Sequence, residues 1–212
     1  MIRGLREILP DNGKAFSSIL ISLKTRNFRL YFTGMCVSLT GTWMQQIAMS
    51  WLVYRLTGSV FLLATVTFMA QIPILLVTPL MSVFVDRFDR QKILILTQSL
   101  SMVQALSMAV LTLSGVIEVW HILILSLLIG CINALDNPTR QAFYPSLVAK
   151  EHLSNAIALN SAVINGSRLI GPAVGGVLIG IFGEGLCFLL NGISYLGVII
   201  ALSLMRLSPF TV

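Results

Sequence analysis

The sequence predicts an all-α membrane protein, a bundle of six transmembrane helices. Of its 212 residues, 56% are hydrophobic and only 10% are charged, whereas a soluble globular domain carries about 25% charged residues. A helix needs about 20 mostly apolar residues to span a bilayer, and six such stretches follow one another along the chain. Runs such as 72–80 and 123–129 are apolar on both faces, unlike the alternating strands of a membrane β-barrel.

The expected spans are separated by short connections, which divides the chain into three parts. We expect a cytoplasmic lead-in over residues 1–29, the six-helix bundle over 30–206 and a cytoplasmic tail over 207–212. The spans themselves cover 30–54, 60–83, 93–114, 119–135, 158–182 and 186–205. None of the connections is long enough to hold a soluble domain, so functional residues are expected in the spans or in the cytoplasmic connections.

The basic residues predict the orientation of the bundle. Six spans place both termini on one side of the membrane. That side carries twelve of the 14 Lys and Arg residues: six in 1–29, three in 87–92, two in 140–150, and Arg206. The opposite side has only Arg55. Because cytoplasmic loops carry the excess of Lys and Arg, we expect a multi-pass protein of the cell (inner) membrane with both termini cytoplasmic. The net charge of +6 therefore reflects topology and does not indicate a nucleic-acid partner.

The sequence contains no pattern typical of an enzyme. It has no Ser/His/Asp set, no phosphate-binding loop and no metal-ligand cluster. Both histidines, His121 and His152, fall at membrane edges, and the three cysteines lie in separate spans. We therefore predict a protein that is not an enzyme and needs no metal or cofactor.

The second-to-third connection interleaves acids and bases between two membrane helices. It contains Asp86, Arg87, Asp89, Arg90 and Lys92 in seven residues. One interpretation is plain topogenic charge. The other is a conformational latch, in which a carboxylate at a helix end exchanges arginine partners as the helices move, since guanidinium–carboxylate bonds are strong and bidentate.

The fifth span combines a small-residue stripe with an arginine. Ser167, Gly171 and Gly175 recur every four residues, which lets two helix backbones approach closely, and Pro172 is expected to kink the helix. The helix-packing motif is Gly171, Pro172, Gly175 and Gly176.

Arg168 is costly in a membrane helix and seldom faces lipid. It shares a polar face with Ser161 and Asn165, so we expect it to line a cavity. The alternative is a structural ion pair with Asp136. Other polar residues in the spans include Gln45 and Gln46, each a candidate for the cavity or for a helix–helix hydrogen bond.

Several stretches resemble the major facilitator superfamily, in its branch of enterobactin-exporter-like and macrolide-efflux-like proteins. Asp86, Arg87 and Arg90 match that family's signature after the second helix, whereas Ser82 and Asp89 replace its two glycines. Residues 136–148 and 155–161 resemble the same branch, as do residues 26–32 and 41–58 and the Gly171–Pro172 pair. The resemblance covers roughly residues 24–206.

The resemblance implies a transporter that exports a small amphipathic molecule by alternating access. Such transporters use twelve helices, so this chain is expected to be an N-terminal half. Its expected partners are the lipid bilayer, an unknown small molecule, and either a separate C-terminal half or a second copy of itself. The alternatives are a non-transporting membrane scaffold and an inactive truncated product. Carboxylates are absent from deep within the first three spans, which leaves Asp136 as the candidate for ion coupling.

Overall fold

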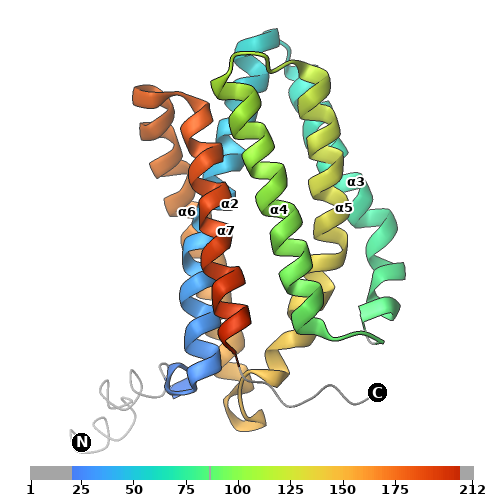
Figure 1. Ribbon diagram of the computed structural model, residues 1–212, viewed down its shortest axis with the longest axis vertical. Coiled ribbons are helices and arrows are strands. Elements are labelled where there is room, and N and C mark those ends of the chain that lie inside the picture. Colours follow the sequence, from blue (N-terminus) through green and yellow to red (C-terminus); the bar gives the residue numbers. More distant parts are fainter. Residues whose placement is uncertain (1–20, 86, 206–212) are drawn as a thin grey trace, which may run out of the picture.

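The computed structural model describes residues 21–85 and 87–205 (Figure 1). Most of the expected lead-in, residue Asp86 and the expected tail therefore lie outside the described residues. Within them, the long helices are α2 (Arg26–Thr57), α3 (Val60–Val85), α4 (Arg90–Leu113), α5 (Val119–Phe143), α6 (Leu153–Phe182) and α7 (Glu184–Leu204). Three short 3₁₀ helices, η1 (Ile21–Lys24), η2 (Tyr144–Ser146) and η3 (Lys150–His152), lie at the end of the bundle where α2 begins and α7 ends. We call this the inner end.

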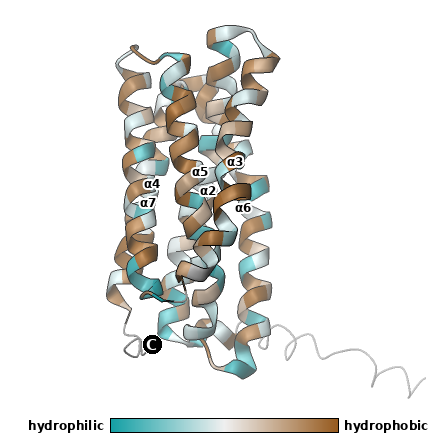
Figure 2. Cartoon of the chain, turned by 90° about the vertical axis from the view of Figure 1, so that its right-hand side faces the viewer, coloured by the Kyte–Doolittle hydropathy of each residue, from teal (hydrophilic) through white to brown (hydrophobic). Residues whose placement is uncertain are grey.

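The predicted all-α membrane fold is confirmed. Within the described part of the chain, α3, α4, α5, α6 and α7 are long and apolar enough to cross a membrane. Hydrophobic residues cover most of the length of the helices, and hydrophilic ones are most frequent near the inner end (Figure 2). The remaining helix, α2, is the longest at 32 residues but is less apolar. It packs against α6 and α7, so less of its surface has to match lipid.

The helices form a row in which each packs mainly on its neighbours. The order is α3, α5, α4, α7, α2, α6, so α3 and α6 stand at the two ends. If α2 is exchanged with α5, α3 with α6 and α4 with α7, the result is the same row in reverse order. The bundle is therefore two three-helix repeats of related packing, an arrangement known from secondary transporters.

Glycines allow the closest helix contacts in this row. On α6, a Cβ added at Gly171 would lie 2.6 Å from the Trp43 Cβ and 2.8 Å from the Thr40 carbonyl oxygen of α2. At the opposite end of the row, where α5 meets α3, a Cβ added at Gly130 on α5 would lie 2.5 Å from the Ala70 carbonyl oxygen of α3. Both distances are too short for any side chain. Small residues at these points let van der Waals packing hold helices together in a solvent as apolar as they are.

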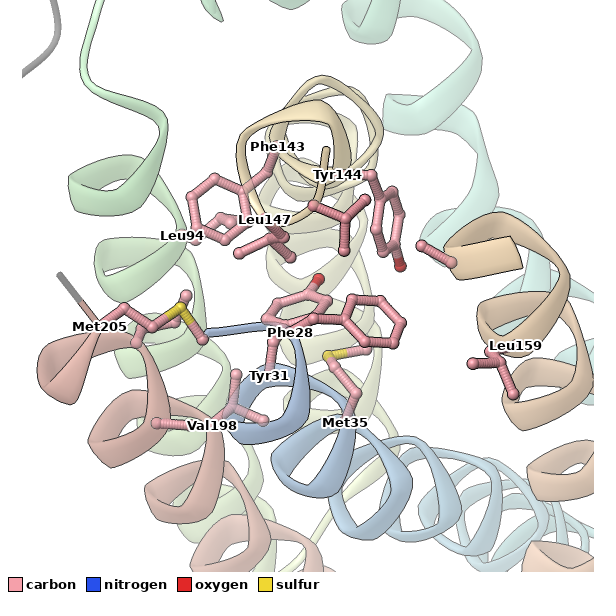
Figure 3. Packing of buried hydrophobic residues seen from close by; sticks show 14 residues of the cluster. Phe28, Tyr31, Met35, Leu94, Phe143, Tyr144, Leu147, Leu159, Val198 and Met205 are labelled. Carbon is pink, nitrogen blue, oxygen red and sulfur yellow. The ribbon is translucent and has the colours of Figure 1, made fainter. Parts of the chain in front are cut away.

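The buried apolar residues form two clusters, one toward each end. The cluster at the inner end brings together α2, α4, α5, α6 and α7 around Phe28, Tyr31 and Phe143 (Figure 3). Tyr31 makes edge-on contacts with both Phe143 and Tyr144. The second cluster, around Leu52, Met108 and Phe188, fills the outer half.

Helix α5 is longer than expected. Residues 136–143, which were predicted to belong to a connection, are part of the helix. The Asn137-Pro138 pair is typical of a turn, and proline costs about 3 kcal/mol inside a helix. The structure nevertheless continues α5 through Pro138 to Phe143. Tertiary contacts made by this extra segment, described below, offset the cost. Helix α6 likewise runs through Pro172 without interruption, and a kink there stays a prediction.

Candidate functional site

A buried ion pair lies in the extended part of α5. Asp136 is only 3% exposed, and its Oδ2 accepts a hydrogen bond of 2.9 Å from Arg140 Nε and a second from Arg140 Nη2. Its Oδ1 accepts from Thr97 Oγ1 at 2.6 Å and from Gln98 Nε2 at 2.9 Å, both on α4. We call these four residues the Asp136 cluster. A carboxylate withdrawn from water costs several kcal/mol unless it is paired and hydrogen-bonded, and four donors meet that need here.

The guanidinium of Arg140 retains capacity for a further ligand. It carries five N–H donors, of which Nε and Nη2 use one each on Asp136. One Nη1 donor contacts the sulfur of Met35, a weak acceptor. Two N–H bonds, one on each terminal nitrogen, thus have no acceptor among the described residues.

A polar cavity of about 270 Å³ borders the Asp136 cluster. It lies among α2, α4, α5, α6 and α7, and its wall is rich in amides and hydroxyls. The side chains of Gln46 and Asn137 on this wall are exposed, so the cavity opens there. Its lining residues of polar type are Ser38, Thr42, Gln46, Gln98, Ser101, Asn133, Asp136, Asn137, Arg140, Asn160 and Tyr195, with Trp43 among the others.

A second cavity of about 500 Å³ continues from the first toward the inner end. The two share Asn137, Arg140, Asn160 and Ile164 in their walls. The second lies between α5 and α6, where Tyr144 donates a hydrogen bond from its hydroxyl to the Asn160 side-chain oxygen. Arg140 thus lies where the two cavities adjoin.

Arg168 does not pair with Asp136. Its guanidinium carbon instead lies 4.7 Å from the centre of the Trp43 ring, within the range of a cation–π contact, and the residue is exposed. The alternative of a structural Arg168–Asp136 pair is therefore wrong, because Arg140 holds that carboxylate. Ser161 and Asn165 are exposed too, and Asn165 donates to the Ser161 carbonyl within the helix. The side chains of α6 that line the cavity are those of Asn160 and Ile164.

The two adjacent glutamines of α2 lie in different environments. Gln46 lines the polar cavity, whereas Gln45 is buried and donates to Gln104 Oε1 at 3.1 Å. Asn191 donates to Gln45 Oε1 at 2.7 Å, and Gln104 donates to the Leu125 carbonyl at 3.3 Å. These bonds join α2, α4, α5 and α7. Gln45 is thus a helix–helix hydrogen-bonding residue and not part of the cavity wall.

The glycines of the helix-packing motif of α6 also lie in two different environments. Gly171 and Gly175 are buried against α2, Gly175 facing Met44 and Ile47, as the small-residue stripe predicts. A Cβ added at Gly176 would have no neighbouring atom within 4 Å among the described residues. Gly176 lines a shallow apolar groove with Trp51, Tyr54 and Gly180.

The candidate latch is described only in part, because Asp86 lies outside the described residues. Arg87 is exposed, and Arg90 donates from Nη1 to the Ala142 carbonyl at 3.2 Å, near the end of α5. Asp89, which stands where the family signature has glycine, is the N-cap of α4 and accepts from the Gln91 amide at 2.9 Å. Its φ of −64° is open to any residue, so glycine is not required there.

Sequence reasoning missed Arg140, Thr97, Gln98, Asn160 and Trp43 as members of the site. One signal was available for Arg140: a carboxylate four residues before a guanidinium is a favourable pair on a helix. That signal was not used because residues 136–143 were assigned to the connection after the fourth span. The other four come from three different helices, α2, α4 and α6, and nothing in their local sequence brings these helices together.

A bundle of apolar helices with an internal repeat, and with an ion pair buried beside a polar cavity, has the architecture of a secondary transporter. The chain belongs to the Transmembrane secretion effector family of major facilitator transporters, whose family model matches residues 17–209. It is a multi-pass membrane protein.

Curated relatives support the same class. The chain is 31% identical to the Staphyloferrin A transporter of Staphylococcus aureus over 168 residues, which cover 79% of this chain and 42% of the relative. It is 28% identical to Macrolide efflux protein A of Streptococcus pyogenes over 73% of this chain and 39% of that protein. It is 25% identical to the Multidrug efflux pump Tap of Mycolicibacterium fortuitum over 76% and 41%, respectively. The chain thus matches about two fifths of the length of these relatives. No solved structure gives a significant match.

Proposed function

We propose that these six helices form one half of a secondary transporter that exports a small amphipathic molecule by alternating access. The efflux proteins among the relatives support the direction of transport. The bundle sits in the inner membrane with both termini in the cytoplasm, a placement supported by the excess of Lys and Arg in the connections at the inner end. The second half is a continuation of the same chain, a separate chain or a second copy.

The observation that carries this proposal is the Asp136–Arg140 pair at the junction of the two cavities. An ionisable group within a membrane helix is expensive and typically marks a path for ions or substrate. Here Asp136 is buried against α4, whereas Arg140 lines both cavities, from which a ligand could contact it. Asp136 is therefore proposed as the coupling residue, and Arg140, Gln46 and Asn160 as residues that contact the transported molecule.

The latch is proposed as the second working part. Arg90 already joins the start of α4 to the end of α5, and Arg87 stands exposed two residues before the α4 cap. In the proposal, Asp86 binds these arginines in one state of the transporter and releases them in the other. The bond to the carbonyl of Ala142 then links latch movement to the helix that carries the Asp136 cluster.

Export of dyes from cells tests the proposal. The complete transporter that contains these six helices is expressed in an efflux-deficient bacterium, and export of the anionic dye carboxyfluorescein and the cationic dye ethidium is followed. Asp136→Asn should abolish export of whichever dye is carried, with export measured per amount of transporter present in the membrane. Glu151→Gln, which alters an exposed carboxylate in η3, is the matched control and should export normally. Full export by Asp136→Asn would contradict the assignment of Asp136.

A further inference from the structure

We propose that the polar cavity binds an anionic group of the transported molecule, a carboxylate fitting best, between Arg140 and the Arg168–Trp43 pair. The proposal rests on the transport function above and narrows its substrate class. It predicts that molecules with an acidic group are preferred over otherwise equal molecules with a cationic one.

The first argument is the balance of charge around the cavity. Its described wall contains one carboxylate, Asp136, and one guanidinium, Arg140, which neutralise each other. Arg168 stands beside this wall over the Trp43 ring, and its guanidinium contacts no carboxylate among the described residues. The site therefore keeps one positive charge in excess. That excess, placed on Arg168 at the edge of the cavity, favours an anion over a cation.

The second argument is the supply of hydrogen bonds. Both oxygens of Asp136 are already occupied by donors, so no free carboxylate is left to receive a cationic ligand. Arg140, in contrast, has two N–H bonds without an acceptor in the described part of the chain. Asn133 and Asn137 add amide donors to the same wall. Arginine binds carboxylates through paired N–H groups, so the unused capacity suits an acid.

The third argument is the position of Arg168. Asn160, Ile164 and Arg168 follow at intervals of four residues, and such residues share one helix face. The first two line the cavity, so Arg168 is the next side chain along that face of α6. The Trp43 ring belongs to the wall of the cavity and also lies under the Arg168 guanidinium. A ligand can thus rest its apolar part on the ring while its acid reaches a guanidinium that the ring already positions.

Fluorescence quenching at Trp43 tests this inference without any transport step. The chain has three tryptophans, so Trp51→Phe together with Trp120→Phe leaves Trp43 as the only reporter. The protein is placed in nanodiscs of neutral phosphatidylcholine and titrated with 10-bromodecanoate, its methyl ester, or the matching bromodecyl trimethylammonium. Bromine quenches tryptophan on contact. Charge-assisted hydrogen bonds should let the acid quench at a concentration about ten-fold lower than the ammonium compound.

Variants decide whether Arg168 is responsible. Arg168→Gln should bring the acid and ammonium curves together within about two-fold, whereas Arg168→Lys should keep the preference for the acid. Arg29→Gln, which removes an exposed arginine from the inner end of α2, controls for general attraction of anions and should change nothing. Thermal unfolding of each variant verifies that the fold is intact.

Two results would overturn the inference. One is equal or stronger quenching by the ammonium compound in the parent, and the other is a full preference for the acid in Arg168→Gln. Neither result bears on export itself, which the dye experiment decides separately. If the parent exports ethidium and Asp136→Asn does not, the proposed transporter is upheld but its preference for acids is contradicted.

Discussion

Replacing Arg140 by Gln should destabilise the protein more than replacing Asp136 by Asn, although both changes break the same ion pair. Arg140→Gln leaves a carboxylate that is 3% exposed with only Thr97 and Gln98 as donors. Breaking a buried pair in this way costs about 3–5 kcal/mol, and we expect the upper part of that range.

The opposite change, Asp136→Asn, is milder for three reasons. The side-chain oxygen of the introduced asparagine can still accept from α4. The Arg140 side chain is 18% exposed and can turn its charge toward the cavity. It lies in the last turn of α5, where a positive charge gains about 0.3–1 kcal/mol. Losing the charged hydrogen bonds should then cost about 2–3 kcal/mol, and the double variant should recover more than half of the Arg140→Gln loss.

Equilibrium unfolding of the purified chain in mixed micelles, followed by its helical signal as dodecyl sulfate is added, measures these differences. Equal losses in the two single variants would refute the argument from burial and helix polarity. A double variant no more stable than Arg140→Gln alone would show that the charges are not coupled.

Three further predictions concern helix packing, the latch and the topology. Gly171→Leu should cost at least about 1–3 kcal/mol by overpacking against α2, whereas Gly176→Leu, which meets open space, should change the unfolding midpoint little; similar losses would refute the assigned faces. Asp89→Ala should remove the α4 cap and cost about 1 kcal/mol with export intact, while Asp86→Asn should impair export at unchanged membrane abundance; normal export by Asp86→Asn would reduce the latch to topogenic charge. A cysteine in place of Lys150 should react with a membrane-impermeant thiol reagent only from the cytoplasm, and labelling of intact cells from outside would reverse the topology.

The helices could be predicted from the sequence because a bilayer requires long apolar stretches, and those are visible locally. The small-residue stripe was informative for the same reason, since Gly171 and Gly175 are spaced to share one helix face. The end of α5 was not predictable in this way. Pro138 indicates a turn, and the helix there is stabilised by tertiary contacts, among them those of Asp136 with α4 and of Phe143 with the cluster at the inner end.

The candidate site was only partly accessible to sequence reasoning. Single polar residues in apolar stretches, such as Asp136 and Arg168, could be identified as unusual. Their partners could not, because a pair such as Asp136 with Thr97 depends on how α4 and α5 are rotated. Gln45 and Gln46 illustrate the limit: adjacent residues point to different neighbours, and only the packing of α2 decides which one reaches the cavity.

The hydrogen bonds that join Gln45, Gln104 and Asn191 bear on how such a bundle can move. They tie α2, α4, α5 and α7 together in the interior, where an unmade bond has no water to replace it. Moving α2 or α4 alone breaks two of these three bonds, and moving α5 or α7 alone breaks one. Helices α3 and α6 stand outside this network at the two ends of the row, and each packs mainly on a single neighbour. We therefore expect these four helices to move together in the proposed transporter and bending to fall to α3 and α6, the two helices that pack mainly on one neighbour each.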